Sequence, residues 1–290
     1  GSMSILPNGC KGIVKENLGG VLEQIDKLQY ARRLILVEGS GDLDFLSNIG
    51  PKYEAWANKS PSGLVFEKMD GIDTLNGKLI SYARALKEVI PSTCEWLIIR
   101  DTDCVPLNKK VTAGNDDKKD VDTSGAPINV LFQNGYGIES TFLSDPDKFA
   151  RLITDYYELN AAEQTNIRAE ITNMINSLCS NVKDVTHPIY KTWKKHFDRQ
   201  LSKRSGRAYK DLTPGDVLTH ITATTIQYIL TKDIMNIFLR DLHAYVATNY
   251  PSITKPVLTS QSIFQYYYSW MTGLTDIFDA HMEILNQIYS

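Results

Sequence analysis

Two apolar stretches that each end abruptly in acidic residues constrain this chain more than any other feature. In Leu34–Asp44 (LILVEGSGDLD), four apolar residues stop at Glu38-Gly39, and Asp42 follows where a helix is expected to begin. In Trp96–Asp103 (WLIIRDTD), a second apolar run ends in Asp101 and Asp103. The carboxyl ends of buried parallel strands open onto the crevice where α/β sheets bind ligands, so these acidic ends are expected to share one site.

The segments around these stretches predict alternating strands and helices. Strands are expected at about 33–38, 64–69, 96–101 and 128–133, and helices at about 42–49 and 74–89. Pro51 is expected to stop the first helix and Pro91 the second. This β-α-β-α-β order implies an α/β fold with a mostly parallel sheet and right-handed crossovers. The polar segment 105–127 is expected to be a mobile surface loop or, because it leaves the sheet beside Asp101, a substrate-gating loop.

The second half of the chain is expected to be entirely helical. After Asp145 there are few strand signals, and helices are expected at about 146–157, 160–180, 188–203, 214–248 and 259–289. Residues 12–30 predict a lead-in helix, and Gly1-Ser2 before Met3 is typical of a tag-cleavage scar. We therefore expect a lead-in at 1–30, a catalytic α/β domain at 31–144, and a helical domain or lid at 145–290.

Five acidic residues follow the expected strands and are the candidate metal ligands: Glu38, Asp42, Asp101, Asp103 and Glu139. Residues i and i+2 of an extended chain share a face, so Asp101 and Asp103 are expected to point the same way. Carboxylate oxygens suit hard cations such as Mg²⁺ rather than Zn²⁺. Clustered carboxylates repel one another, so the pKa of at least one of them is expected to be high in the absence of metal.

These motifs resemble those of the TOPRIM domain. VEGSGDLDFL, IIRDTD and YGIESTFL, in this order between about Ala31 and Leu143, are most similar to the overcoming-lysogenization-defect (OLD) nucleases. They are also similar to stand-alone relatives of the DUF4435 type, a group that includes the nuclease subunit of the PARIS anti-phage system. The order and spacing of the three motifs are more specific than any one of them.

The resemblance implies a metal-dependent nuclease and gives each acidic residue a role. It implies that Asp101 and Asp103 hold Mg²⁺ or Mn²⁺, and that Glu38 is a further ligand or the general base. Asp42 matches a second-metal carboxylate, so one or two ions are implied, and Glu139 matches a later acidic position of the branch. It also implies a nucleic-acid substrate, an ABC- or SMC-like ATPase partner and a homodimer, with the chain as the toxic effector of an anti-phage system.

The segment Lys191–Lys210 is the candidate nucleic-acid interface. It holds eight Lys or Arg residues and one acid, so its net charge is +7, which leaves about −10 for the rest of the chain. Basic residues interleaved with aromatic ones suit a phosphate backbone and stacked bases. The alternative is a solvated helix face with Trp193 and Phe197 in the core. The candidate binding residues are Lys191, Lys194, Lys195, Arg199, Lys203, Arg204 and Arg207.

Composition and missing motifs exclude several other classes. Four scattered cysteines without a CxxC pair indicate neither a disulfide framework nor a zinc site, and no apolar run is long enough for a membrane span, so a cytoplasmic protein is expected. The sequence contains no GxxxxGK[ST] motif, so a phosphate-binding loop is not indicated. The aromatic run Ile263–Ile288 is expected to be mainly core, with a dimer or partner surface as the alternative.

Two functional interpretations stay open at this point. The first is a metal-dependent nuclease acting on tRNA, other RNA or DNA. The second is a non-catalytic subunit of an ATPase complex that uses the same fold as a scaffold for binding. The complete acidic set favours the nuclease.

Overall fold

A four-stranded parallel sheet organises the molecule. The computed structural model describes residues 27–68, 93–121, 128–203 and 209–290. The strands are β1 (Arg33–Val37), β2 (Leu64–Lys68), β3 (Glu95–Arg100) and β4 (Ile128–Phe132), in the order β2-β1-β3-β4. All three strand pairs are parallel. The expected α/β class is therefore confirmed, and each expected strand lies within one residue of its observed position.

Helices cover the sheet and extend beyond it. α2 (Ser40–Ala57) follows β1, and α4 (Lys110–Val121) follows the short η2 (Leu107–Lys109). After β4 come η4 (Ile138–Ser144), α5 (Pro146–Tyr156), α6 (Ala161–Asn181), α7 (Pro188–Lys203), α8 (Pro214–Leu218) and η6 (Ile226–Ile229). The chain ends with α9 (Lys232–Asn249), α10 (Ser262–Trp270), η7 (Leu274–Asp276) and α11 (Asp279–Ile288).

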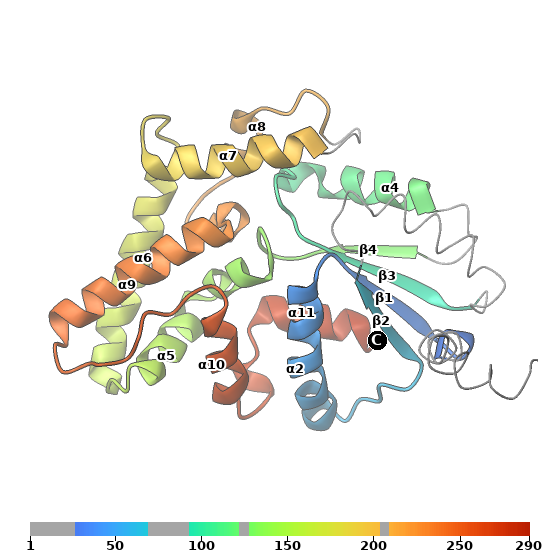
Figure 1. Ribbon diagram of the computed structural model, residues 1–290, viewed down its shortest axis with the longest axis horizontal. Coiled ribbons are helices and arrows are strands. Elements are labelled where there is room, and N and C mark those ends of the chain that lie inside the picture. The colour runs from blue at the N-terminus through green and yellow to red at the C-terminus, as the bar shows by residue number, and fades with distance from the viewer. Residues whose placement is uncertain (1–26, 69–92, 122–127, 204–208) are drawn as a thin grey trace, which may run out of the picture.

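The two faces of the sheet belong to different clusters of buried side chains. Ile35, Val37, Leu97 and Ile99 face a large core shared with α2 and the C-terminal helices, whereas Leu34, Leu36, Trp96 and Ile98 face a smaller one. In Figure 1, α2 and α11 lie below the sheet, α4 lies above it, and α5, α6, α7 and α9 gather to its left. The large core runs without a break from the sheet into these helices.

α2 is longer than expected, and Pro51 lies inside it. The expectation that Pro51 ends the helix is therefore wrong. The ring of a proline clashes with the Cβ of the preceding residue and disfavours the helical conformation there. Here the preceding residue is Gly50, which has no Cβ, so the helix continues through the proline to Ala57.

Most of the segment expected to be a loop at 105–127 is helical. Residues 107–121 form η2 and α4, which overturns both the surface-loop and the gating-loop expectation over this range. The segment has weak helix propensity of its own, but Ala113 is buried and Gly114 lies against Val130 and Phe132 of β4. Packing against a sheet edge stabilises a helix that propensity alone would not predict.

The expected helix 214–248 is interrupted at a threonine-rich segment. α8 ends at Leu218 and α9 begins at Lys232, with η6 between them. Thr225 Oγ1 donates to the carbonyl of His220 at 2.8 Å and accepts from the amide of Thr222 at 2.8 Å. Threonine side chains that bond nearby backbone groups compete with the helical hydrogen bonds, so the helix stops here.

The expected helix 259–289 is also interrupted, between α10 and α11. Asp276 Oδ2 accepts from the amide of Thr272 at 2.7 Å and from its hydroxyl at 2.8 Å, which closes a turn after Trp270. The aromatic residues of this region belong to the core, as expected: Tyr267 and Phe278 are fully buried, and Phe264 packs against the same cluster.

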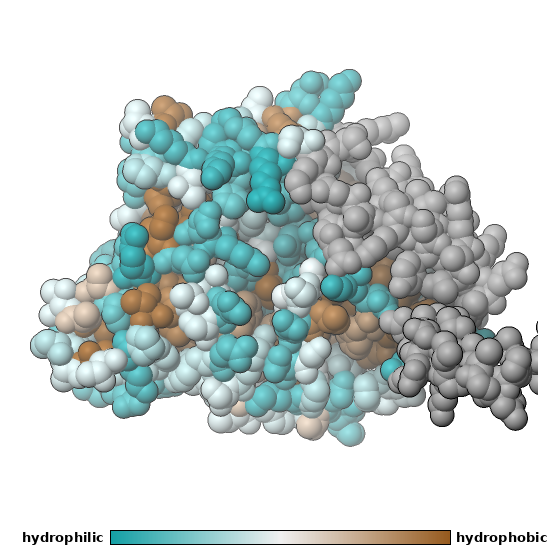
Figure 2. Space-filling view, in the orientation of Figure 1, coloured by the Kyte–Doolittle hydropathy of each residue, from teal (hydrophilic) through white to brown (hydrophobic). Residues whose placement is uncertain are grey.

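Two further expectations involve residues that the structure does not describe. The helix at 74–89 lies outside the described residues, as does most of the lead-in helix, of which 27–29 are described and helical. Within the described residues, no helix is both long and apolar enough to cross a bilayer. Figure 2 shows small hydrophobic spots scattered among hydrophilic side chains over the helical part of the visible face.

Candidate metal centre

The five candidate acids follow the carboxyl ends of three neighbouring strands. Glu38 follows β1, Asp101 and Asp103 follow β3, and Glu139 lies in η4, which comes after β4. Asp42 lies in the first turn of α2. The order of the strands therefore brings together residues that are about one hundred positions apart in the sequence.

Asp101 is the centre of this acidic cluster. Its Oδ1 is buried and accepts no hydrogen bond from the described residues. A Cβ placed on Gly137 would lie 3.4 Å from Asp101 Oδ2 and 3.2 Å from Glu139 Oε2, so these two carboxylates flank the same glycine. A side chain at position 137 would press on both, which is the physical reason for a glycine there.

Asp42 is fixed by the start of its own helix and by the end of β4. Its Oδ2 accepts from the amide of Gly39 at 3.1 Å, which satisfies one of the free amides at the helix N-terminus. Its Oδ1 accepts from Gln133 Nε2 at 3.0 Å. Asp42 is only 9% exposed, so burial and these two hydrogen bonds set its position.

Asp103 does not continue the strand, contrary to the expectation that it shares an extended face with Asp101. β3 ends at Arg100, and Asp103 has a φ of 47°, in the left-handed region that aspartate tolerates better than most residues. Its amide donates to the carbonyl of Tyr136 at 3.1 Å, and its Oδ1 accepts from Gln200 Nε2 of α7 at 3.3 Å. A turn therefore positions Asp103 and brings α7 to the edge of the cluster.

Glu38 is held by a buried arginine. Val37 pairs with Ile99, so Glu38 is level with Arg100, the residue before Asp101. Glu38 Oε1 lies 3.4 Å from Arg100 Nε, and the arginine side chain is 1% exposed. Side chains alternate between the two faces of a sheet, so Glu38 is expected on the same face as Arg100, and Asp101 on the opposite face. The charge of Glu38 nevertheless raises the pKa of Asp101, so the two carboxylates interact.

Lys232 is the cation beside the cluster that the sequence analysis missed. It is the first residue of α9, and its Nζ lies 3.8 Å from Glu139 Oε1. Glu139 is nearly buried, whereas the Lys232 side chain is 71% exposed. The amine can therefore face both the acidic cluster and an incoming anion. No local motif around Thr231-Lys232 signals this role.

Burial and mutual repulsion disturb the ionisation of the cluster. Burial raises the pKa of Asp101 well above its ordinary value, and the charges of Asp42, Glu38, Asp103 and Glu139 raise it further. Burial also raises the pKa of Asp42 and of Glu139, and the charge of Lys232 opposes the rise in both. The expectation of at least one high pKa is confirmed, with burial as the larger cause.

The carboxylates gather without closing around one point. Within the described residues, no three Asp, Glu, His or Cys side chains converge closely enough to hold a metal ion as they stand. The donor set still fits a hard cation in chemistry, because it consists of carboxylate oxygens and includes the unpartnered Asp101 Oδ1. Side-chain rotation is needed before these oxygens can share one ion.

The basic segment divides into a buried aromatic face and an exposed basic face. Trp193 and Phe197 are 0% and 1% exposed, so the interpretation in which they stack on bases is wrong and the core alternative holds. Tyr209 is buried as well. Trp193 and Phe197 pack inward because α7 is amphipathic, and its apolar side faces α6 and α9.

The charged residues of α7 differ in what they contact. Lys191, Lys195 and Arg199 are exposed and four residues apart, so they form one stripe along the helix. Lys194 Nζ is paired with both oxygens of Asp198, at 2.7 and 2.6 Å. The Lys203 side chain, Arg204 and Arg207 lie outside the described residues. Gln200, next to Arg199, bonds Asp103, so the stripe leads toward the cluster.

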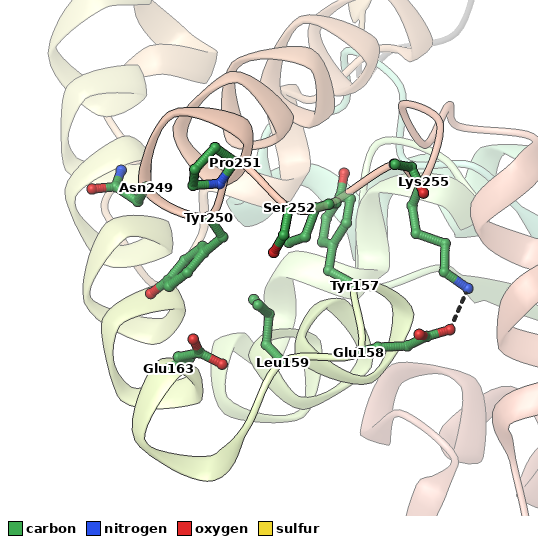
Figure 3. Close-up of a pocket in the computed structure, with 11 residues that line it drawn as sticks. Tyr157, Glu158, Leu159, Glu163, Asn249, Tyr250, Pro251, Ser252 and Lys255 are labelled. Carbon is green, nitrogen blue, oxygen red and sulfur yellow. Dashed lines mark ion pairs between the residues drawn. The ribbon is translucent and has the colours of Figure 1, made fainter.

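A separate pocket lies between the α5–α6 junction and the segment after α9 (Figure 3). Its volume is about 470 Å³, and Tyr157, Leu159 and Tyr250 are among the residues that line it. Two of its charged groups are paired with each other: Lys255 Nζ lies 2.6 Å from Glu158 Oε1, the ion pair drawn as a dashed line in Figure 3. None of the five candidate acids lines this pocket.

Comparisons of the chain with protein-family models, with curated proteins and with solved structures found no match. The functional argument therefore rests on the residues themselves.

Proposed function

We propose that this chain is a divalent-cation-dependent nuclease that hydrolyses phosphodiester bonds in nucleic acid. The observation that carries the proposal is Asp101, a buried carboxylate with an unpartnered oxygen and four other carboxylates acting on it. Burying unpaired negative charge is costly, and a bound cation is a means of offsetting that cost. A site that only stabilised the fold would be expected to pair this group.

Each side chain of the cluster has a role in this proposal. Asp101, Asp103, Asp42 and Glu139 would hold one or two Mg²⁺ or Mn²⁺ ions, which neutralise charge on the scissile phosphate and lower the pKa of a water. Glu38 would serve as a further ligand or as the general base, for which its side chain would have to leave Arg100.

Lys232 extends this site toward its substrate. Its exposed ammonium lies at the edge of the cluster, where it would contact a phosphate oxygen while it remains close to Glu139. Deprotonation is not required for this role, because the charged form of a lysine binds phosphate.

The substrate would approach along α7. Lys191, Lys195 and Arg199 present charge on one exposed stripe, and Gln200 connects the end of this stripe to Asp103. Contacts of this kind bind the phosphate backbone with little preference for sequence. The same surface would therefore accept tRNA, other RNA or DNA.

The resemblance to TOPRIM nucleases of the OLD and DUF4435 type supports the same proposal and extends it. It suggests a toxic effector of an anti-phage system that acts in the cytoplasm as a homodimer. It also suggests that an ABC- or SMC-like ATPase partner controls the activity.

A second candidate function is a non-catalytic binding subunit of such an ATPase complex. Two observations favour it: Glu38 is bonded to Arg100, and the described carboxylates do not converge around one point. In that case the cluster would be a remnant of a site, and the helical part would dock the partner.

Cleavage assays on three substrates separate these two candidates. Plasmid DNA, single-stranded DNA and tRNA are incubated with Mg²⁺ or Mn²⁺ and the intact chain, the variant Asp101→Asn, or Asp147→Asn as a matched control. Asp147 lies on α5, is exposed and pairs with Arg168, and it is not one of the five candidate acids. We expect cleavage by the intact chain and the control and a loss of at least about 100-fold in Asp101→Asn.

Mn²⁺ binding tests the proposal even if the nuclease is inhibited and cleaves no substrate. If the intact chain cleaves nothing, with or without a partner ATPase, and binds Mn²⁺ no more tightly than Asp101→Asn, the nuclease proposal is wrong and the binding subunit is favoured.

A further inference from the structure

Gln133 occupies the position beside Asp101 at the carboxyl end of the sheet. Arg100 pairs with Phe132 in the β3–β4 ladder, so the next residue on each strand, Asp101 and Gln133, also stand level. The amide of Gln133 continues the ladder by donating to the carbonyl of Arg100 at 2.8 Å. Side chains at paired positions of neighbouring parallel strands share a face and lie about 5 Å apart.

The backbone of Gln133 is fixed from two other directions. Its carbonyl accepts from Thr102 Oγ1 at 2.8 Å and from Lys110 Nζ at 3.4 Å. Thr102 comes from the turn after β3, and Lys110 is the first residue of α4. Gln133 therefore has little freedom to move away from the cluster, and its side chain is 1% exposed.

One end of the Gln133 side chain is satisfied and the other is not. Nε2 donates to Asp42 Oδ1 at 3.0 Å, so the amide nitrogen of Gln133 faces Asp42. This leaves Oε1, which is buried and has no hydrogen-bond partner. A buried acceptor without a partner costs about 1–3 kcal/mol. Asp101 Oδ1, on the neighbouring strand, is unpartnered in the same way.

Two unpartnered oxygens at the same level of neighbouring strands require the same kind of partner. A cation satisfies both, as does a water molecule that donates to each, but only the cation also offsets the negative charge of Asp101. Carboxamide oxygens are ligands of hard divalent cations. An apolar ligand would leave both oxygens unpaired, and an anion would be repelled by Asp101.

We propose that Gln133 is a further residue of the cation site, which holds Asp42 through Nε2 and gives Oε1 to the divalent cation. This inference rests on the proposed function, because it assumes that the acidic cluster binds such a cation. It adds a neutral oxygen donor to a set otherwise made of carboxylates. No acidic motif marks Gln133 in the sequence.

Mn²⁺ affinity, measured by electron paramagnetic resonance on the full chain, tests the inference without an activity assay. Gln133→Met keeps the length of the side chain but removes both the oxygen and the N–H groups. Gln133→Glu keeps an oxygen at this position and removes the N–H group that bonds Asp42. We expect Gln133→Met to weaken Mn²⁺ binding about 10-fold or more and Gln133→Glu to retain it within a few-fold.

The other outcomes contradict the inference. Unchanged Mn²⁺ affinity in Gln133→Met means that Oε1 is no ligand, and equal losses in both variants mean that Gln133 only positions Asp42. If Gln133→Met does not fold, Gln133→Glu decides alone, since a loss of 10-fold or more in it overturns the inference.

The intact chain and Asp101→Asn separate this inference from the proposed function. If the intact chain binds Mn²⁺ and Asp101→Asn does not, the cation site stands whatever Gln133 does. If the intact chain does not bind Mn²⁺, the proposed function fails and the inference fails with it.

Discussion

At the scale of single residues, Glu38 interacts with two buried charged residues. Its carboxylate contacts Arg100, and its charge acts on Asp101. Removing one member of a buried ion pair costs up to about 3–5 kcal/mol, and Arg100 also lies over the ring of Phe132. We therefore predict that Glu38→Gln lowers the free energy of unfolding by up to about this amount, and that the double variant Glu38→Gln/Arg100→Met recovers much of it, as urea unfolding would measure.

Mn²⁺ binding in the same two variants separates the structural role of Glu38 from its proposed chemical role. Glu38→Gln replaces a charged oxygen ligand with a neutral one, and removing Arg100 does not restore that charge, so affinity is expected to stay low in both variants. Affinity that returns in the double variant would mean that Glu38 is a partner of Arg100 and not a ligand.

His281 predicts how stability depends on pH. It is fully buried between Thr141 and Tyr267, and burial lowers its pKa to about 3. In the unfolded chain this histidine is protonated below about pH 6.5, whereas in the folded chain it is protonated only below about pH 3. The contribution of this group to stability therefore falls as pH drops between these values, by at most about 1.4 kcal/mol per pH unit.

Comparison with a residue that does not titrate isolates this effect. We predict that the free energy of unfolding of His281→Gln varies less steeply with pH between 6.5 and 3 than that of the intact chain, whatever its absolute stability. Parallel curves for the two proteins, measured in urea at several pH values, would show that His281 titrates normally.

At the scale of elements, Arg33 connects the last helix to the sheet. From the start of β1 it donates to the carbonyls of Gln287 and Ile288 at the end of α11, and to Glu95 of β3. Free carbonyls at a helix end need such donors. We predict that Arg33→Met costs about 1–3 kcal/mol and speeds hydrogen exchange in α11. The matched control is Arg32→Met, since Arg32 makes one exposed bond to Ser290. Equal exchange in both variants would contradict the prediction.

The basic stripe of α7 is the element that we expect to bind nucleic acid. Lys195 and Arg199 are exposed, and none of the described residues forms an ion pair with either. We predict that Lys195→Glu/Arg199→Glu weakens binding of catalytically inactive protein to tRNA and to DNA. The slope of log affinity against log salt is expected to fall by nearly one unit for each duplex phosphate that the variant no longer neutralises. Arg240→Glu on α9 is the control, because Arg240 is exposed and paired with Asp241.

The sequence predicts well where one local signal decides the structure. Leu34–Val37 and Trp96–Ile99 are apolar runs cut off by acids, and the strands lie where these runs do. Likewise, Asp145-Pro146 predicts the first residue of α5 correctly, because an N-cap followed by proline is a local pattern. The helix at 107–121 was missed because Ala113 and Gly114 depend on contacts with β4, which no local window contains.

The candidate site divides in the same way. The five acids are marked by their place after strands, whereas no motif marks Lys232, Gln200 or Gln133 as part of the site. Lys232 and Gln200 come near the acids only because α9 and α7 pack beside η4 and the turn after β3. The two faces of α7 show what sequence alone does not predict, since composition does not say whether Trp193 stacks on bases or packs in the core.

At the scale of the whole molecule, the expected boundary near residue 144 crosses a continuous core. Phe142 of η4 packs against Phe264 and Phe278 from the end of the chain, and Phe45 of α2 also contacts Phe264. Tyr53 of α2 donates to Asn286 of α11 at 2.7 Å. The last helices are therefore part of the support of the α/β part, and a chain cut at 144 would expose these rings to water.

Two buried tryptophans can report on both sides of this boundary separately. Trp96 lies in β3 and is 2% exposed, and Trp193 lies in α7 and is 0% exposed. Chains that keep only one of them, with the other tryptophans replaced by phenylalanine, give one fluorescence signal for each part. Because a shared core unfolds as a unit, we predict that the two urea transitions coincide in midpoint and slope once the stability of each variant is matched by circular dichroism. Midpoints that differ between fluorescence and circular dichroism within one variant would mean that the two parts unfold independently. The helical part would then be a separable domain, and Gln200 and Lys232 would reach the acids across a domain interface and not within a single core.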